Sequence, residues 1–150
     1  MQKYKVTFSA PAKNHQKDAA GCYCVFDNKI LILQRHSSKF EGGTWGVPGG
    51  KIELFETAKQ ACIREVLEEV GIDIPEDQLK EIGVMCVERE DISYAFYLFA
   101  YCFGHMPEVI LELSEHVEYG WFSYEEAKKL PLIPSGLEAL EFFYQKGLIV

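Results

Sequence analysis

Residues 50–72 read GKIELFETAKQACIREVLEEVGI, and this stretch decides the fold. The segment 57–70 has the residue spacing of an α-helix, and Gly71 is a favourable residue just beyond a helix C-terminus. Apolar residues form a wide flank along this helix, which predicts that the flank is buried against the rest of the protein. The members of the flank are Cys62, Ile63, Val66, Leu67 and Val70.

The same helix carries three carboxylates on one side. At about 100° per residue, Glu65, Glu68 and Glu69 fall within a single sector. Like charges at this spacing repel one another, and Arg64, which can pair with Glu68, is a single cation against three anions. A glutamate-rich helix face is most often a solvated surface, so the spacing alone leaves that interpretation open. The functional alternative is a hard divalent cation bound by carboxylate oxygens.

The segment before the helix, 37–51, reads SSKFEGGTWGVPGGK. Its glycines predict a long loop that turns sharply or approaches a ligand closely. Arg35 and Lys51 border the loop and can hold phosphate oxygens, although a surface salt bridge is the alternative for each. Trp45, like Phe40 and the aromatic residues of 94–101, can stack on a nucleobase or serve as a core residue.

The other periodic segments predict a mixed sheet with helices on two faces, in the α/β (α+β) class. Strands are expected at 19–26, 30–34, 80–89, 92–103 and 117–122, the first two forming a hairpin. Ser123 with Glu126, and Ser135 with Glu138, fit the capping box that begins a helix. We expect one domain over 18–150, preceded at 1–17 by a tail or by an extra strand at 3–8.

Composition and charge narrow the class of protein. The 150 residues carry a formal net charge of −8, which disfavours non-specific nucleic-acid binding and calls for a cation to bridge any anionic substrate. The sequence has no apolar run long enough to cross a bilayer and no signal-peptide core, so we expect a cytoplasmic protein. The five cysteines lack CxxC spacing and lie in apolar stretches, which favours reduced core thiols.

A family resemblance joins these observations. Gly50, five residues, Glu56, seven residues and then REVLEEVGI from Arg64 match the complete Nudix box, GX5EX7REUXEEXGU with U aliphatic. The chain resembles the Nudix hydrolase family also in WGVPGG at 45–50 and EHVEYGWF at 115–122. The resemblance implies an α/β/α sandwich with a mixed β-sheet. It further implies hydrolysis of a pyrophosphate bond in a nucleoside diphosphate linked to a group X, with Mg²⁺ as cofactor and Mn²⁺ as a substitute.

The resemblance also implies roles for particular residues. The implied metal ligands are Glu65, Glu68, Glu69 and the Gly50 carbonyl, with Arg64 orienting the carboxylates. One glutamate would act as general base, with Glu65 as first choice and Glu69 as runner-up. Many members have glycine at the position of Phe55, so the shape of this turn is expected to differ here. A further acidic ligand often comes from a later loop, where Glu115 and Glu118 are the candidates.

Substrate class is less well specified. Ser135 lies where nucleotide-cleaving relatives often place a base-contacting loop, although its capping role is the alternative. Chain length, the loop 43–51 and this C-terminal loop look most like enzymes acting on (deoxy)nucleoside triphosphates. The alternatives are a nucleotide-sugar or other nucleoside-diphosphate hydrolase, and a nucleotide-binding module without catalysis. A homodimer formed through the N-terminal strand is compatible with the sequence.

Overall fold

The computed structural model describes residues 4–9, 17–89 and 93–150. The strands are β1 (Tyr4–Phe8), β2 (Ala19–Phe26), β3 (Lys29–Arg35), β4 (Trp45–Gly46), β5 (Gly49–Lys51), β6 (Lys80–Arg89), β7 (Ser93–Cys102) and β8 (His116–Phe122). The helices are α1 (Ala58–Val70), α2 (Tyr124–Lys128) and α3 (Gly136–Tyr144), with a 3-10 turn, η1, at Glu76–Gln78. None of the described helices is long and apolar enough to cross a membrane.

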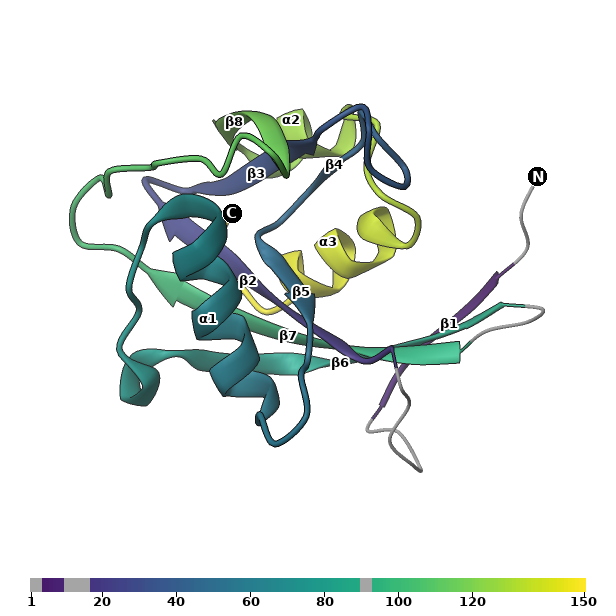
Figure 1. The fold of residues 1–150 in the computed structure, drawn as a ribbon. Coiled ribbons are helices and arrows are strands. Elements are labelled where there is room, and N and C mark those ends of the chain that lie inside the picture. The colour runs from purple at the N-terminus through teal and green to yellow at the C-terminus, as the bar shows by residue number, and fades with distance from the viewer. Residues whose placement is uncertain (1–3, 10–16, 90–92) are drawn as a thin grey trace.

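The strands form one mixed sheet in the order β1-β6-β7-β2-β3-β4 (Figure 1). β2 runs parallel to β7 and antiparallel to β3, while β8 pairs with β3 and β5 pairs with β2. The predicted β2–β3 hairpin is confirmed. It turns at Asp27 and Asn28, whose φ angles of 51° and 61° lie in the left-handed region that tight hairpins favour. β1 pairs with β6, so residues 4–8 form a strand of the sheet. Lys3 and Ile92, which begin two of the expected strands, lie outside the described residues.

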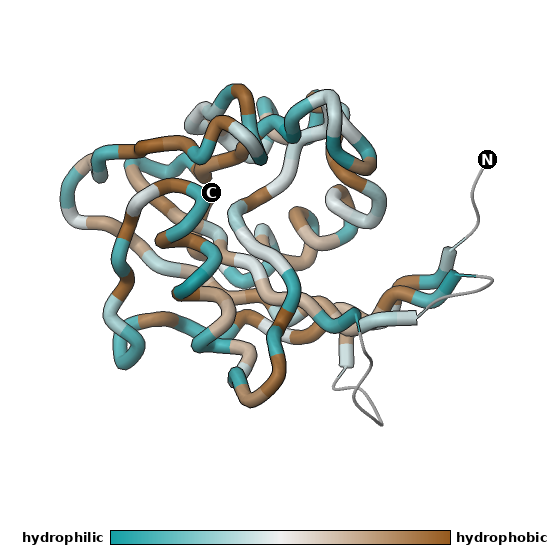
Figure 2. Tube along the Cα trace, viewed as in Figure 1, coloured by the Kyte–Doolittle hydropathy of each residue, from teal (hydrophilic) through white to brown (hydrophobic). Residues whose placement is uncertain are grey.

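Helices cover both faces of the sheet (Figure 1). Side chains alternate along β2, so Cys22 and Cys24 pack beneath α1 while Tyr23 and Val25 pack beneath α3. In Figure 2, α1 alternates between brown and teal stretches, as expected of a helix with one face against a sheet. The predicted mixed sheet with helices on two faces is therefore confirmed.

Helix α1 has the ends that its sequence predicts. The Thr57 hydroxyl accepts a hydrogen bond from the Gln60 backbone N–H at 3.1 Å, and Gly71 ends the helix with a φ of 73°. The predicted apolar flank is wrong at one position, because Leu67 is 48% exposed whereas Val66 is fully buried. Leu67 lies at the outer edge of the apolar sector, where the helix surface turns away from the sheet.

The glycine-rich segment 37–51 contains more regular structure than the expected loop. β4 pairs with β3, and β5 pairs antiparallel with the first half of β2. A Cβ atom at Gly49 would lie 2.3 Å from the backbone oxygen of Ala20. Glycine is thus needed at Gly49, where β5 approaches β2 closely. This pairing places residues 49–51 beside α1.

Helix α3 does not begin with the predicted capping box. Ser135 is the N-cap residue, but its φ is 65° and its side chain makes no capping bond. Its hydroxyl donates instead to the Pro134 carbonyl, because the left-handed backbone turns the side chain away from the first helical turn. The other predicted box, Ser123 with Glu126 at the start of α2, is confirmed.

The cysteines divide between core and surface. Cys22, Cys24 and Cys62 are fully buried between the sheet and α1, as predicted for core thiols. Cys102 is exposed, and the prediction is wrong for that residue. It stands at the last position of β7, where the strand leaves the covered part of the sheet.

Candidate active site

An acidic cavity of about 690 Å³ lies beside α1 and β5. The lining residues are Arg35, Gly49, Gly50, Glu53, Arg64, Glu65, Glu68, Glu69, Glu112, Ser114 and Glu115. Six of these are glutamates and two are arginines. The cavity thus brings together the three helix glutamates, Gly50, Arg64, Arg35 and Glu115, all predicted site residues. Lys51 and Glu118, also predicted, do not line it.

Arg64 organises the carboxylates around the cavity. Its guanidinium holds Glu56 through two hydrogen bonds, from Nε at 2.6 Å and from Nη2 at 3.0 Å. Nη1 donates to Glu65 at 3.0 Å and to Glu68 at 3.3 Å. The Arg64 hydrogen bonds hold the pKa of Glu56 below its ordinary value. Arg64 is therefore a positioning residue that links Glu56, the first acidic position of the motif, to Glu65 and Glu68 on the helix.

Glu65 approaches the backbone of β5 at Gly50. A Cβ atom at Gly50 would lie 2.5 Å from Cδ of Glu65, so a larger residue would push this carboxylate away. Glu65 is half-buried, and burial raises its pKa despite the neighbouring Arg64. The packing explains in physical terms why glycine stands at the first position of the motif.

Glu69 is the most deeply placed of the three helix glutamates, at 7% exposure. Its Oε1 accepts a hydrogen bond from the Gly49 backbone N–H at 2.8 Å. Burial raises the pKa of Glu69 to about 8, and the Gly49 hydrogen bond only partly opposes this rise. Glu68, in contrast, has an exposed side chain. One helix therefore supplies three carboxylates in three different electrostatic environments.

The loop before β8 closes another side of the cavity. Glu112 is anchored there by its backbone N–H, which donates to the Glu69 carbonyl at 3.0 Å. Glu115 lines the cavity and forms an ion pair with Lys39 at 3.4 Å. Glu118 does not line the cavity, because it pairs with Gln34, whose side chain lies on the opposite face of β3 from that of Arg35.

Two cationic residues border the site in different ways. Arg35 lines the cavity, and its Nε donates to the Phe40 carbonyl at 2.9 Å, which leaves its other guanidinium N–H groups for a ligand. Lys51 is exposed, and its backbone carbonyl accepts from Arg64 Nη2 at 3.1 Å. The structure thus places Lys51 beside the site through its main chain.

The donor chemistry of the cavity fits a hard divalent cation, since Mg²⁺ and Mn²⁺ prefer carboxylate and carbonyl oxygens. As the side chains lie, no three His, Cys, Asp or Glu residues of the described ranges are grouped closely enough to hold an ion. Arg64 draws Glu65 and Glu68 to one side while Gly49 holds Glu69 on the other. Binding an ion would therefore require the carboxylates to turn toward it.

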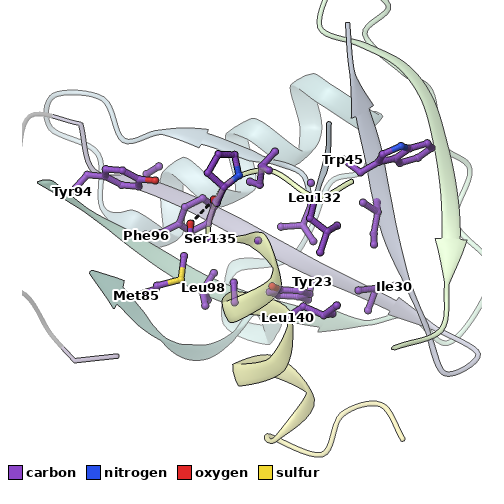
Figure 3. Close-up of a pocket in the computed structure, with 18 residues that line it drawn as sticks. Tyr23, Ile30, Trp45, Met85, Tyr94, Phe96, Leu98, Leu132, Ser135 and Leu140 are labelled. Atoms are coloured by element: carbon purple, nitrogen blue, oxygen red, sulfur yellow. Dashed lines mark hydrogen bonds between the residues drawn. The ribbon is translucent and has the colours of Figure 1, made fainter. Parts of the chain in front are cut away.

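A second, smaller cavity of about 130 Å³ lies on the α3 face of the sheet (Figure 3). Trp45 and Ser135, both predicted substrate contacts, line it together with Tyr94 and Phe96 of β7. None of its lining residues is charged. The edge of the Trp45 ring packs against Phe122, with ring centroids 5.5 Å apart. Phe40 lines neither of the two cavities and is 76% exposed.

Sequence reasoning missed several residues of both cavities. Glu112 and Ser114 belong to a segment without periodicity, so only the loop's anchoring on α1 reveals their position. Glu53 could have been found, because it lies in the turn between Gly50 and Glu56. Tyr23 reads as an ordinary strand residue, and only its place in the second cavity distinguishes it.

Comparisons with known proteins agree with this geometry. A family model of the NUDIX domain matches residues 15–143. The chain is 35% identical over 119 residues to the CTP pyrophosphohydrolase of Escherichia coli strain K12, covering 78% of this chain and 83% of that protein. It is 39% identical over 80 residues to the 8-oxo-dGTP diphosphatase of Proteus vulgaris, and the match covers 53% of this chain and 71% of that protein. The crystal structure of a MutT NUDIX hydrolase from Burkholderia pseudomallei is similar, with a TM-score of 0.72 and 26% sequence identity. The match covers 83% of this chain and 95% of that one.

Proposed function

The chain belongs to the Nudix hydrolase family, and from this premise we propose that it hydrolyses a (deoxy)nucleoside triphosphate to the monophosphate and pyrophosphate. The observation that carries the proposal is the pairing of two unlike cavities along one short segment. Residues 45–47 line the apolar cavity, and Gly49 and Gly50 line the acidic one. A heterocycle joined to a polyphosphate has this same division of character.

The apolar cavity suits the heterocycle. Its walls include the aromatic rings of Trp45, Tyr94 and Phe96 and the aliphatic side chains of β3 and α3. A flat ring gains favourable stacking and loses little hydration in such a site. Trp45 and Ser135 are therefore proposed as substrate contacts on the base side.

The acidic cavity suits the polyphosphate only with cations present. Its glutamates would repel phosphate oxygens. Of the two arginines that line it, Arg64 is already bonded to carboxylates, whereas Arg35 is bonded to the Phe40 carbonyl. When bound, Mg²⁺ or Mn²⁺ would neutralise the pyrophosphate and activate water for attack. The proposed ligands are Glu65, Glu68, Glu69 and the Gly50 carbonyl, with Glu115 as a further candidate.

The chain's own groups then have separate tasks. Arg64 holds Glu65 and Glu68 at the cavity wall, and Arg35 binds a phosphate oxygen. The proposed general base is Glu65, because it is half-buried beside Gly50 and its pKa is raised toward the range useful for proton transfer. Glu69 is the alternative base, with an even larger rise of its pKa.

The names of the relatives support a triphosphate. CTP and 8-oxo-dGTP, which name the two relatives, are both nucleoside triphosphates, although their bases differ. The two relatives thus share the polyphosphate and not the heterocycle. We therefore propose the triphosphate class and leave the individual base open to the substrate panel.

A substrate panel tests the proposal. Ribonucleoside and deoxyribonucleoside triphosphates, nucleoside diphosphates and nucleotide sugars are incubated with Mg²⁺ or Mn²⁺, and released pyrophosphate and phosphate are measured. We expect pyrophosphate from at least one triphosphate and a higher kcat/KM for it than for any nucleotide sugar. Cleavage of nucleotide sugars alone would refute the triphosphate proposal.

A matched pair of variants tests the site. Glu69→Gln keeps the hydrogen bond from Gly49 but removes the charge, and we expect kcat to fall by about 100-fold or more. Glu81→Gln changes an exposed glutamate of β6 outside the cavity and should retain the wild-type rate. Equal rates in the two variants would exclude the acidic cavity as the catalytic site.

A further inference from the structure

Tyr23 places a hydroxyl group inside the apolar cavity. The residue belongs to β2, is 3% exposed, and stacks on Phe143 of α3 with ring centroids 4.1 Å apart. In Figure 3 its hydroxyl oxygen lies at the end of the ring that points away from Ile30 and toward Leu98. No residue that the structure describes forms a hydrogen bond with this oxygen, and it is not among the fully buried polar atoms that lack a partner, so it is accessible from the cavity.

A hydroxyl that faces a cavity and has no partner in the protein is available to hydrogen-bond to water or to a ligand. Phenylalanine would stack on Phe143 equally well without offering that group. Tyr101, in contrast, has a hydroxyl that donates to Gln78 at 3.3 Å. The oxygen of Tyr23 therefore has no structural use within the described parts of the chain.

Among the residues that line this cavity, Tyr23 carries the main polar group that is both deeply placed and without a partner. The lining is otherwise apolar apart from Trp45, Tyr94 and Ser135. Ser135 already donates its hydroxyl proton to the Pro134 carbonyl, and Tyr94 and Trp45 are only half-buried. Burial also raises the pKa of Tyr23, so its hydroxyl stays neutral and can both donate and accept.

We propose that the Tyr23 hydroxyl binds a carbonyl, amino or ring-nitrogen group on the edge of the nucleobase, and that it is a specificity-determining residue. The inference rests on the proposed function, which places the base in this cavity. The polar edge of the base enters first, and the sugar and phosphates follow along residues 45–50. Because a hydroxyl both donates and accepts, Tyr23 recognises a polar base edge in general and rejects a ring that lacks one.

The test is the substitution Tyr23→Phe, which removes one oxygen and keeps the ring. Kinetics are measured with the best triphosphate of the substrate panel, and with the triphosphate of an unsubstituted ring of the same size. For the natural base we expect KM to rise about 3- to 10-fold, the range of one neutral hydrogen bond, with kcat within about twofold. For the unsubstituted ring, which the Tyr23 hydroxyl rejects, KM should be lower in the variant than in the wild type.

Thermal unfolding without ligand supplies a second readout. Because the oxygen faces the cavity and has no partner in the described chain, Tyr23→Phe should keep a Tm within a few degrees of the wild type. This result also shows that the variant folds. The matched control is Tyr97→Phe on β7, whose side chain packs on the α1 face of the sheet, and its KM values should equal those of the wild type.

The outcomes separate the two proposals. If the wild type hydrolyses a triphosphate but Tyr23→Phe keeps the same KM for both substrates, the role of Tyr23 is overturned and the proposed function stands. If the wild type hydrolyses no nucleotide, the proposed function fails and the inference fails with it. A rise in KM for the natural base alone, with Tyr97→Phe unaffected, supports the inference.

Discussion

Gly50 shows how one missing side chain can shape a catalytic site. Glu65 occupies the space where a Cβ atom would stand, at 2.5 Å from its Cδ. That contact is with the end of a flexible side chain, so the fold can tolerate a methyl group while the carboxylate cannot keep its place. The cost of a substitution should therefore appear in the rate and not in the stability.

The first prediction follows from this geometry. Gly50→Ala should lower kcat/KM by about 10- to 100-fold, because a small displacement of a catalytic group is costly. Its Tm should stay within a few degrees of the wild type. Gly104→Ala is the control, since a Cβ atom at Gly104 would meet nothing within 4 Å. A fully active Gly50→Ala enzyme would contradict the role assigned to Glu65.

Phe55 is a strained residue beside the same site. Its φ is 69° and its side chain is 96% exposed, so no packing contact offsets the left-handed backbone. The turn between β5 and α1, which contains it, appears as a brown tip in Figure 2. Phe55 thus adopts the backbone conformation that a glycine at this position would favour, and the expected change in the shape of this turn stays a prediction.

The second prediction is that Phe55→Gly stabilises the protein. Relief of backbone strain outweighs the added entropy of the unfolded chain, for a net gain of about 0.5 to 1 kcal/mol in the free energy of unfolding. Urea denaturation measures the change. Leu54→Gly is the matched control, because Leu54 is 83% exposed but has no positive φ, and it should lose stability. Similar losses in both variants would argue against strain at Phe55.

At the scale of elements, two similar sequence patterns behave differently. Thr57 and Gln60 form a reciprocal capping box at α1, with bonds of 3.1 and 3.0 Å. Ser135 and Glu138 have the same spacing at α3, yet Ser135 is left-handed and makes no capping bond. The Tyr4 hydroxyl lies near both of these residues and has its pKa raised by burial and by Glu138. The Tyr4 side chain of β1 thus lies at the start of α3, beside Glu138.

The third prediction compares these two helix starts. Thr57→Ala should lower the free energy of unfolding by about 1 kcal/mol, because an orphan N–H of α1 loses its partner. Ser135→Gly should change it by less than about 0.5 kcal/mol, since no cap is lost and glycine accepts the positive φ. Guanidinium denaturation of both variants gives the values. A larger loss in Ser135→Gly would show that its side chain stabilises the helix start.

At the scale of the whole molecule, two chemical environments lie on the two faces of the sheet, and residues 45–50 run from one to the other. The acidic cavity is on the α1 face and the apolar cavity is on the α3 face. β2 lines the apolar cavity through Ala19 and Tyr23, and it supports the acidic one indirectly by pairing with β5. The acidic side contains two buried titratable groups with opposite effects on stability. Burial raises the pKa of Glu69 to about 8 and lowers that of His116 to about 4.

The fourth prediction concerns pH and metal. In protein kept in EDTA, protonated Glu69 adds to the free energy of unfolding. This contribution is full below pH 4.5 and is lost as the pH rises through 8. Burial of neutral His116 lowers the free energy of unfolding only below pH 6.5. The two effects oppose each other between pH 4.5 and 6.5. We therefore expect stability to decline from pH 6.5 to 8, by at most about 1.4 kcal/mol per pH unit.

Thermal unfolding across this pH range measures the decline. Glu69→Gln should abolish it, because the amide does not titrate. Added Mg²⁺ or Mn²⁺ should reduce it in the wild type, since a bound cation favours the charged carboxylate. An identical decline in Glu69→Gln would assign the effect to another group.

Local features of this protein follow from its residue order alone. The ends of α1, the β2–β3 hairpin and the common sector of Glu65, Glu68 and Glu69 depend on residues a few positions apart. Periodicity, capping residues and turn residues act over that range, so the helix, its ends and the hairpin can be predicted before the tertiary structure is known. The motif also identified the family, because its spacing is specific.

Only the tertiary structure decided how these features meet. The burial of Glu69, its bond to Gly49, the closure of the cavity by Glu112 and the place of Tyr23 in the apolar cavity all join segments that are distant in the chain. Pairing across the sheet also keeps Glu118 out of the cavity, since its partner Gln34 faces the opposite side of β3 from Arg35. A side chain's environment is set by what packs against it, and periodicity carries no information about partners across the sheet.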